Sequence, residues 1–128
     1  MKFGKMTALF CIGGASYVAL ELLWRGNSHY SMFLAGGTCF LLLGKLNRTE
    51  PRLPLSVRAL FASLVITSVE LLAGLLFNRN YTVWDYRGMP LNFYGQICLP
   101  YILLWIPLGV FAMFFYEQAE RLLRKAFD

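Results

Sequence analysis

Apolar residues along this chain fall into four long runs separated by short polar segments. The runs cover Met6–Leu23, Tyr30–Leu46, Leu55–Phe77 and Gly88–Tyr116, and the last contains no charged residue. A helix needs about 20 mostly apolar residues to cross the hydrocarbon core of a bilayer. None of the runs alternates like a half-buried strand, and strands span lipid only in closed barrels. The pattern therefore predicts an all-α integral membrane protein with four transmembrane helices in one bundle.

The composition supports a membrane protein and excludes several other classes. Of the 128 residues, 58% are hydrophobic and 15% are charged, whereas soluble domains average about 25% charged residues. The 16% of aromatic residues exclude a disordered chain, and three cysteines argue against a disulfide-stapled secreted domain. The net charge of +5 is spread between the apolar runs, so the expected partner is the lipid bilayer and not nucleic acid.

The distribution of Lys and Arg predicts how the chain sits in the membrane. Nine basic residues lie in the N-terminal segment, in the C-terminal tail, and in the link between the second and third runs together with the run ends beside it, and three lie in the other two links. Because cytoplasmic segments are enriched in Lys and Arg, we expect a cell-membrane protein with both termini in the cytoplasm. Residues 1–128 form a single transmembrane domain in this interpretation, and 117–128 form a cytoplasmic amphipathic tail helix. The tail could bind anionic headgroups or be only a solvated helix end that fixes the topology.

The two halves of the chain, about 6–46 and 55–116, share an order of motifs. Glu21 and Glu70 are each followed by two leucines, then by a link, and then by a Gly-x-x-Cys segment: Gly36–Cys39 in the first half and Gly95–Cys98 in the second. The shared order predicts two repeated helical hairpins. With two helices in each unit, the copies have the same orientation and are related by an axis along the membrane normal.

Several short motifs are similar to those of a known family of membrane proteins. They are Glu21, Phe33-Leu34-x-Gly36-x-x-Cys39, Glu70-x-x-x-Gly74, Trp84-Asp85-Tyr86, Pro90-Leu91-Asn92-x-x-Gly95-x-Ile97-Cys98-Leu99 and Trp105. In these motifs, over about Tyr17 to Leu108, the chain resembles the CmpB-type family named "putative ABC-transporter type IV". The resemblance implies a permease and, through the family name, a separate ATPase subunit as partner.

Two carboxylates interrupt the apolar runs and are the first candidates for a binding site. An ionised side chain at the bilayer centre is costly and usually faces a bundle interior or a cavity. Glu21 lies four residues before Arg25, so the two can form a structural pair on one helix face or belong to a site. Glu70 has no charged residue at helical spacing, and we expect it to pair with Arg25, Arg79 or Arg87, or to be neutral.

The link from Asn78 to Tyr94, which overlaps the start of the fourth run, is unusually rich in polar and aromatic residues. Trp84, Tyr86 and their aromatic neighbours are typical of a membrane-interface belt, which leaves Asp85 and Asn92 unexplained. The link could bind a polar headgroup, or it could be a latch, a purely structural segment that fixes the loop to the helices. The predicted substrate-binding residues are Glu21, Arg25, Glu70, Trp84, Asp85, Tyr86 and Asn92, and we expect Glu21, Glu70, Asp85 and Asn92 to converge on one outward-facing cavity.

The remaining reactive side chains do not form a recognisable catalytic or metal motif. Cys39 and Cys98 are most simply small buried residues, and His29 is the single histidine. No catalytic residue, cofactor or metal is expected, and an enzyme is the less favoured class. The sequence favours a small permease-like protein that binds a small polar or lipid-like substrate between its halves, as a homo-oligomer or with an ATPase subunit. A membrane-embedded enzyme acting on a lipid headgroup and a non-catalytic assembly subunit stay open as alternatives.

Overall fold

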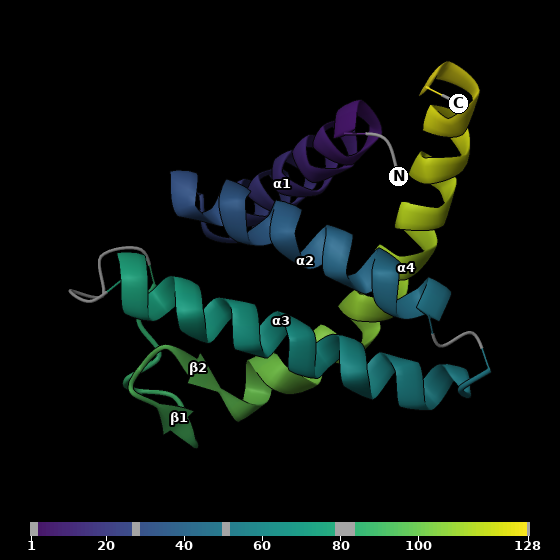
Figure 1. Ribbon diagram of the computed structural model, residues 1–128. Helices are drawn as coiled ribbons and strands as arrows, with labels where there is room; N and C mark the ends of the chain where they lie inside the picture. The colour runs from purple at the N-terminus through teal and green to yellow at the C-terminus, as the bar shows by residue number, and fades with distance from the viewer. Residues whose placement is uncertain (1–2, 27–28, 50–51, 79–83, 128) are drawn as a thin grey trace.

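The computed structural model describes residues 3–26, 29–49, 52–78 and 84–127. Four helices and a two-stranded hairpin occupy these ranges (Figure 1). In chain order the elements are α1 Phe3–Arg25, α2 Tyr30–Thr49, α3 Leu55–Phe77, β1 Asn92–Phe93, β2 Ile97–Cys98 and α4 Leu99–Phe127. The prediction of an all-helical membrane fold is confirmed in its main part, since the hairpin adds only four strand residues.

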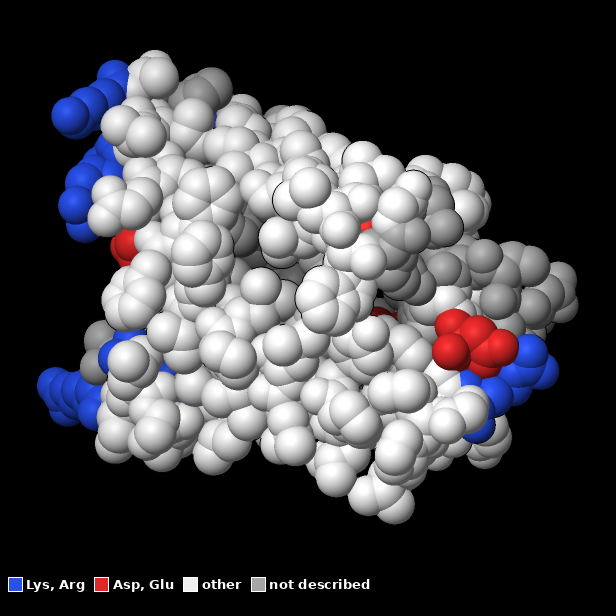
Figure 2. All heavy atoms as spheres, turned by 180° about the vertical axis from the view of Figure 1, so that it is seen from behind, with Lys and Arg blue, Asp and Glu red and all other residues white. Residues whose placement is uncertain are grey.

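Three of the four helices are long and apolar enough to cross a membrane. They cover Phe3–Trp24, Leu55–Phe77 and Leu99–Ala126, with mean hydropathies of 1.6, 2.1 and 1.9. Glycines, Thr38 and Lys45 dilute the apolar residues of α2, so a fourth transmembrane helix stays a prediction. Figure 2 shows blue and red side chains at the two ends of the molecule and a broad white surface between them, as expected for a protein surrounded by lipid.

The fourth helix begins later than its apolar run, because a hairpin precedes it. Tyr94 and Gly95 have φ angles of 53° and 68°, as the central residues of a type I′ turn require. The Gln96 N–H donates to the Phe93 carbonyl at 3.0 Å and closes the turn. The strands pair antiparallel, with Asn92 opposite Cys98 and Phe93 opposite Ile97. An uncharged run therefore does not mean a continuous helix.

The helices form two adjacent pairs joined by α4. Helix α1 packs mainly against α2, and α3 packs mainly against α4. In Figure 1 the green first part of α4 runs along α3, and the yellow second part turns away past α1 and α2. Pro107 lies inside α4, and a proline removes a helical hydrogen bond and bends the axis. The bend allows one helix to join two core clusters, one around Trp105 and Met113 and another around Tyr116.

The two Gly-x-x-Cys segments have different local structures. Gly36–Cys39 lies within α2, whereas Gly95–Cys98 contributes to the turn and to β2. Glu21 and Glu70 are more alike, since both lie in the second half of a long helix. The expected duplication therefore stays a prediction, and in the described structure it has support only from the two acidic positions.

An ion cluster fixes the C-terminal part of α4 to the first two helices. Glu120 is 1% exposed and lies 2.6 Å from Nη2 of Arg48 and 3.6 Å from Nζ of Lys5. Arg124, one helical turn further on, also donates to Glu120. Burying a carboxylate is tolerated when charges and hydrogen bonds surround it. The expected tail helix is thus the continuation of α4, and its acidic side is packed against the bundle.

Candidate functional site

A recess lies between α1 and the first part of α4. Its volume is about 400 Å³, which is within the range of small-molecule sites. The residues around it come from α1, from the segment before β1, and from α4. They are Tyr17, Leu20, Glu21, Trp24, Tyr86, Tyr101, Leu104, Trp105, Pro107 and Leu108. We call this space the aromatic cavity.

Aromatic rings make a continuous wall on one side of the aromatic cavity. Tyr86 stacks on Tyr101 with a centroid distance of 4.8 Å and an interplanar angle of 15°. The next ring along α4, Trp105, lies 5.7 Å from that of Tyr101. Trp24 on α1 donates from its indole nitrogen to the Tyr101 hydroxyl at 3.4 Å. The wall thus ties α1, the link and α4 together.

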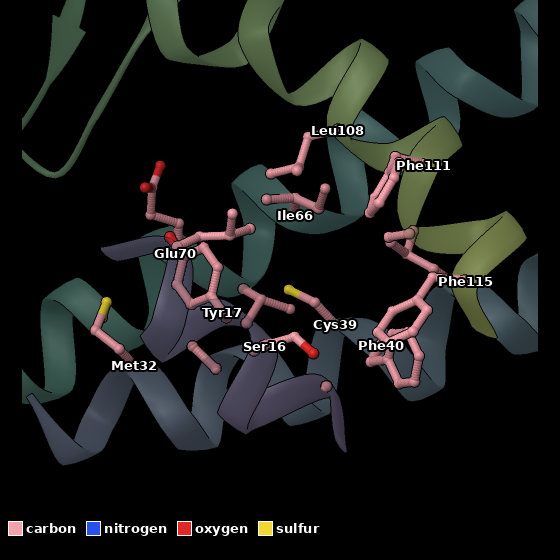
Figure 3. Close-up of a pocket in the computed structure, with 17 residues that line it drawn as sticks. Ser16, Tyr17, Met32, Cys39, Phe40, Ile66, Glu70, Leu108, Phe111 and Phe115 are labelled. Atoms are coloured by element: carbon pink, nitrogen blue, oxygen red, sulfur yellow. The ribbon is translucent and has the colours of Figure 1, made fainter. Parts of the chain in front are cut away.

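A second, smaller cavity lies next to the first and opens to the surface. Its volume is about 90 Å³ and all four helices contribute to its lining. Figure 3 shows Tyr17 and Glu70 near one end of it and Phe40, Phe111 and Phe115 near the other. Tyr17, Leu20 and Leu108 line both cavities, so the two spaces share a wall.

Tyr17 enters this wall because α2 has a glycine opposite it. A Cβ added at Gly36 would lie 2.5 Å from the Cβ of Tyr17, closer than carbon atoms approach without a shift. The small residue therefore allows α1 and α2 to pack closely, as in many membrane helix pairs.

The two intramembrane carboxylates reach the cavities from different helices. Glu70 on α3 is 8% exposed, lines the smaller cavity, and accepts a hydrogen bond of 3.2 Å from the Tyr86 hydroxyl. Glu21 on α1 is partly buried and lines the aromatic cavity. Tyr86 is therefore a bridge between Glu70 and the aromatic wall. In the structure, Glu21, Glu70 and Tyr86 lie around two adjoining cavities.

A buried network of amide groups fixes Trp84, which belongs to the link between α3 and α4. Its backbone N–H donates to Asn78 Oδ1 at 3.1 Å and its indole N–H donates to the Gln96 carbonyl at 2.8 Å. Asn78 Nδ2 donates to Gln96 Oε1 at 2.9 Å, and Gln96 Nε2 donates back to the Asn78 carbonyl at 3.0 Å. Trp84 is 4% exposed and lines neither of the two cavities in the described structure. Its contacts therefore fit the latch, by which we mean the network of Asn78, Trp84 and Gln96.

Asp85 and Asn92 form hydrogen bonds within the exposed part of the link and do not line either cavity with Glu21 and Glu70. Asp85 receives two side-chain hydrogen bonds from Arg87, at 2.9 and 2.8 Å, and both side chains are exposed. These hydrogen bonds, with one from the Arg87 backbone N–H, lower the pKa of Asp85 to about 2. Asn92 donates to the Arg87 and Met89 carbonyls and accepts from the Gly95 N–H. The expected convergence of these two residues with Glu21 and Glu70 is therefore not found.

Arg25, Arg79 and Arg87 are the basic partners expected for Glu70. Arg25 ends α1, but its side chain, like the whole of Arg79, lies outside the described residues. Arg87 forms its described ion pair with Asp85. Between Glu70 and the link, the interaction that the structure gives is the hydrogen bond from Tyr86.

Several lining residues were missed by reasoning from the sequence alone. Tyr17, Trp24, Tyr101 and Trp105 belong to the aromatic cavity but are easily mistaken for ordinary membrane-helix aromatics. Their spacing carried a signal, because Tyr17, Glu21 and Trp24 follow one face of α1, and Tyr101 and Trp105 one face of α4. Gln96 and Asn78 carried no comparable signal, since their contacts depend on the hairpin.

Polar groups in this region differ in how they are satisfied. The Trp105 indole N–H is buried and has no hydrogen-bond partner within the described part of the chain. Cys98 is fully buried and Cys39 partly buried, and both are free thiols. The described residues contain no group of three or more His, Cys, Asp or Glu side chains suited to a metal ion.

Apolar helices around aromatic and acidic cavities define a small helical membrane protein. The sequence matches the model of a known protein family over residues 4–126. The chain belongs to this family, which is described as "Putative ABC-transporter type IV". Comparisons with curated proteins and with solved structures gave no match.

Proposed function

We propose that this chain is a permease-type membrane subunit that binds a small polar or lipid-like substrate in the aromatic cavity. The observation that carries the proposal is the cavity of about 400 Å³ between α1 and α4, with Glu21 in its lining and Glu70 bonded to the Tyr86 of its wall. A space of this size in an apolar bundle, with few polar groups, is typical of small-molecule sites. The family description supports a role in transport.

The proposal includes an orientation in the cell membrane. The ends of the helices that carry Lys5, Arg48 and Glu120 lie together, and the positive-inside rule assigns this end to the cytoplasm. Glu21 and Glu70 lie nearer the other end of α1 and α3. The aromatic cavity would then be accessible from the outer half of the membrane, between the first and second halves of the chain.

Transport coupled to ATP hydrolysis would need a second protein. The sequence contains no glycine-rich phosphate-binding loop of the Walker type, so a separate ATPase subunit would supply the energy. Many apolar side chains on the helices are exposed, among them Leu64, Leu72 and Phe111. A homo-oligomer would cover part of this surface and enlarge the space that four helices enclose.

Native mass spectrometry of the protein extracted from its own membranes tests the proposed binding site. We expect the wild-type chain to retain a small molecule and the Leu104→Trp variant to lose it, because Leu104 lines the aromatic cavity and an indole would fill part of it. Leu103→Trp is the matched control, since Leu103 is also exposed but lines neither cavity. Equal retention by both variants would contradict the proposal.

Glu70→Gln separates a functional from a structural role of the buried carboxylate. Glutamine keeps an acceptor for the Tyr86 hydroxyl and removes a charge that is costly in an apolar bundle. We expect the thermal unfolding temperature to be kept or raised and ligand binding to be lost. A lowered unfolding temperature with binding intact would support a non-catalytic assembly subunit, and turnover of a labelled lipid by the pure protein would support the enzyme alternative.

A further inference from the structure

The chemistry of the aromatic cavity indicates the charge of its ligand. We propose that the cavity takes an organic ammonium cation, with a quaternary or tertiary nitrogen and an apolar substituent. The inference rests on the proposed binding function and deepens it by naming the class of substrate. Three features carry it: the number of ring faces, the sign of the nearby charges, and the lack of a coordination set for a bare ion.

Aromatic side chains supply half of the lining. Tyr17, Trp24, Tyr86, Tyr101 and Trp105 are five of the ten lining residues. The negative face of an aromatic ring attracts an ammonium group, most strongly for tryptophan, and several rings around one cation make the usual cage for quaternary ammonium ligands. Tyr86 stacks on Tyr101, and Trp105 lies next to Tyr101 with its ring tilted by 41°. These three rings would form one side of such a cage, and Tyr17 and Trp24 on α1 would form the other.

The charged residue among those that line the aromatic cavity is acidic. Glu21 is the one ionisable acid or base with a formal charge at neutral pH among its lining residues. Glu70 stands behind the wall and accepts the hydrogen bond of Tyr86, which makes that phenol ring more electron-rich. Arg87 is engaged with Asp85 on the exposed surface of the link. A cation entering the aromatic cavity would therefore meet the carboxylate of Glu21 in a medium of low dielectric constant, with Glu70 on the far side of the Tyr86 ring.

The same lining is unsuited to a metal ion or an anion. Hard cations need several oxygen ligands at short distance, and the described residues hold no cluster of three acidic, thiol or imidazole groups. An organic cation keeps its charge behind methyl groups, which pack on ring faces and on Leu20, Leu104 and Leu108.

Phenethyltrimethylammonium and its neutral carbon isostere, 3,3-dimethylbutylbenzene, test the proposal. Binding to the purified full-length chain in detergent is followed by intrinsic fluorescence, because two of the three tryptophans line the aromatic cavity. We expect the cation to bind at least about tenfold more tightly than the isostere, from cation–π and carboxylate attraction together. Equal affinities would overturn the proposal.

Variants separate the contributions of charge and ring. We expect Glu21→Gln to weaken binding of the cation by about tenfold, and the neutral isostere to be unaffected. Glu117→Gln is the matched control, because Glu117 lies at the opposite end and contacts Arg48. Tyr101→Leu should weaken binding and Tyr101→Phe, which keeps the ring, should preserve most of it. Circular dichroism confirms that each variant is folded. Unchanged affinity in both Glu21→Gln and Tyr101→Leu would refute the proposal.

A third arm identifies the source of the ammonium group. Phosphatidylcholine added to the micelles competes with the probe if the cavity takes a lipid headgroup, and leaves probe binding unchanged if it takes a free cation. Either result supports an ammonium site. If wild-type protein carries a neutral or anionic molecule that Leu104→Trp loses, the proposed binding function stands and the cationic class fails. If Leu104→Trp and the wild type carry the same molecule, the proposed site itself fails.

Discussion

Acidic side chains of this chain are held in three different ways, and each follows from what surrounds the carboxylate. Glu70 is buried and bonded to a phenol hydroxyl, Glu120 is buried among three cations, and Asp85 is exposed beside one arginine. Sequence position alone predicted that Glu70 would be enclosed. It could not predict Glu120, because the cations around it come from α1, α2 and the next turn of α4.

Asp85 gives a prediction for pH. Because its pKa is lowered from 3.8 to about 2 by hydrogen bonds from the Arg87 side chain and backbone, the stability that the pair contributes is fully present above the unfolded pKa. It is lost as the pH falls from about 4 through about 2. We expect the carboxyl carbon resonance of Asp85 to titrate near pH 2, and near its ordinary pKa in Arg87→Gln. Titration of both proteins at the same pH would show that the pair is absent in solution.

At the level of elements, the link before α4 is the part that the sequence predicted least well. The run Leu55–Phe77 gave the bounds of α3, because helix length and hydropathy suffice where a segment is regular. The hairpin depends on positive φ angles at Leu91, Tyr94 and Gly95, of which only the glycine is suggested by residue type. Within the link, Tyr86 lines the aromatic cavity and Trp84 belongs to the buried amide network.

The amide network of the latch can be tested with one substitution. In Gln96→Leu, Asn78 loses both an acceptor for its side-chain N–H and a donor to its carbonyl. Each buried polar group left unsatisfied costs about 1–3 kcal/mol, so we expect a lower unfolding temperature and faster proteolysis of the link. Asn92→Ala is the control, because Asn92 is exposed and water can replace its bonds. Equal loss in the two variants would mean that burial of the network does not matter.

For the whole molecule, the pattern of charge predicted the arrangement of the helix ends. Lys5, Arg48 and Glu120 come from the start of α1, the end of α2 and the end of α4, and they meet at one end. A chain with four crossings would bring these segments to one end, because each crossing reverses its direction, and the fourth crossing stays a prediction. The cavities were beyond such reasoning, because their shapes depend on the bend of α4 and on which rings meet across helices.

Labelling of single cysteines tests the orientation. In a background without the native cysteines, we expect Gly88→Cys to react with an impermeant maleimide on intact cells and Thr49→Cys to react only after permeabilisation. Gly88 and Thr49 are both exposed and lie at opposite ends of the bundle, and nine of the twelve basic residues belong to the segments on the Thr49 side. The reverse pattern would place the aromatic cavity on the cytoplasmic side.

Helix α4 also fixes the distance and the relative direction between the cavity wall and the ion cluster. Trp105 belongs to the cavity wall and Glu120 to the ion cluster, within one continuous helix. Inserting a single residue after Val110 would turn everything beyond it by about 100° and carry Glu120 away from Lys5 and Arg48. Inserting seven would restore the direction to within about 20° but displace the carboxylate by about 10 Å along the axis. Both the phase and the length of this stretch are therefore fixed, although lipid surrounds most of it and would accept nearly any apolar sequence.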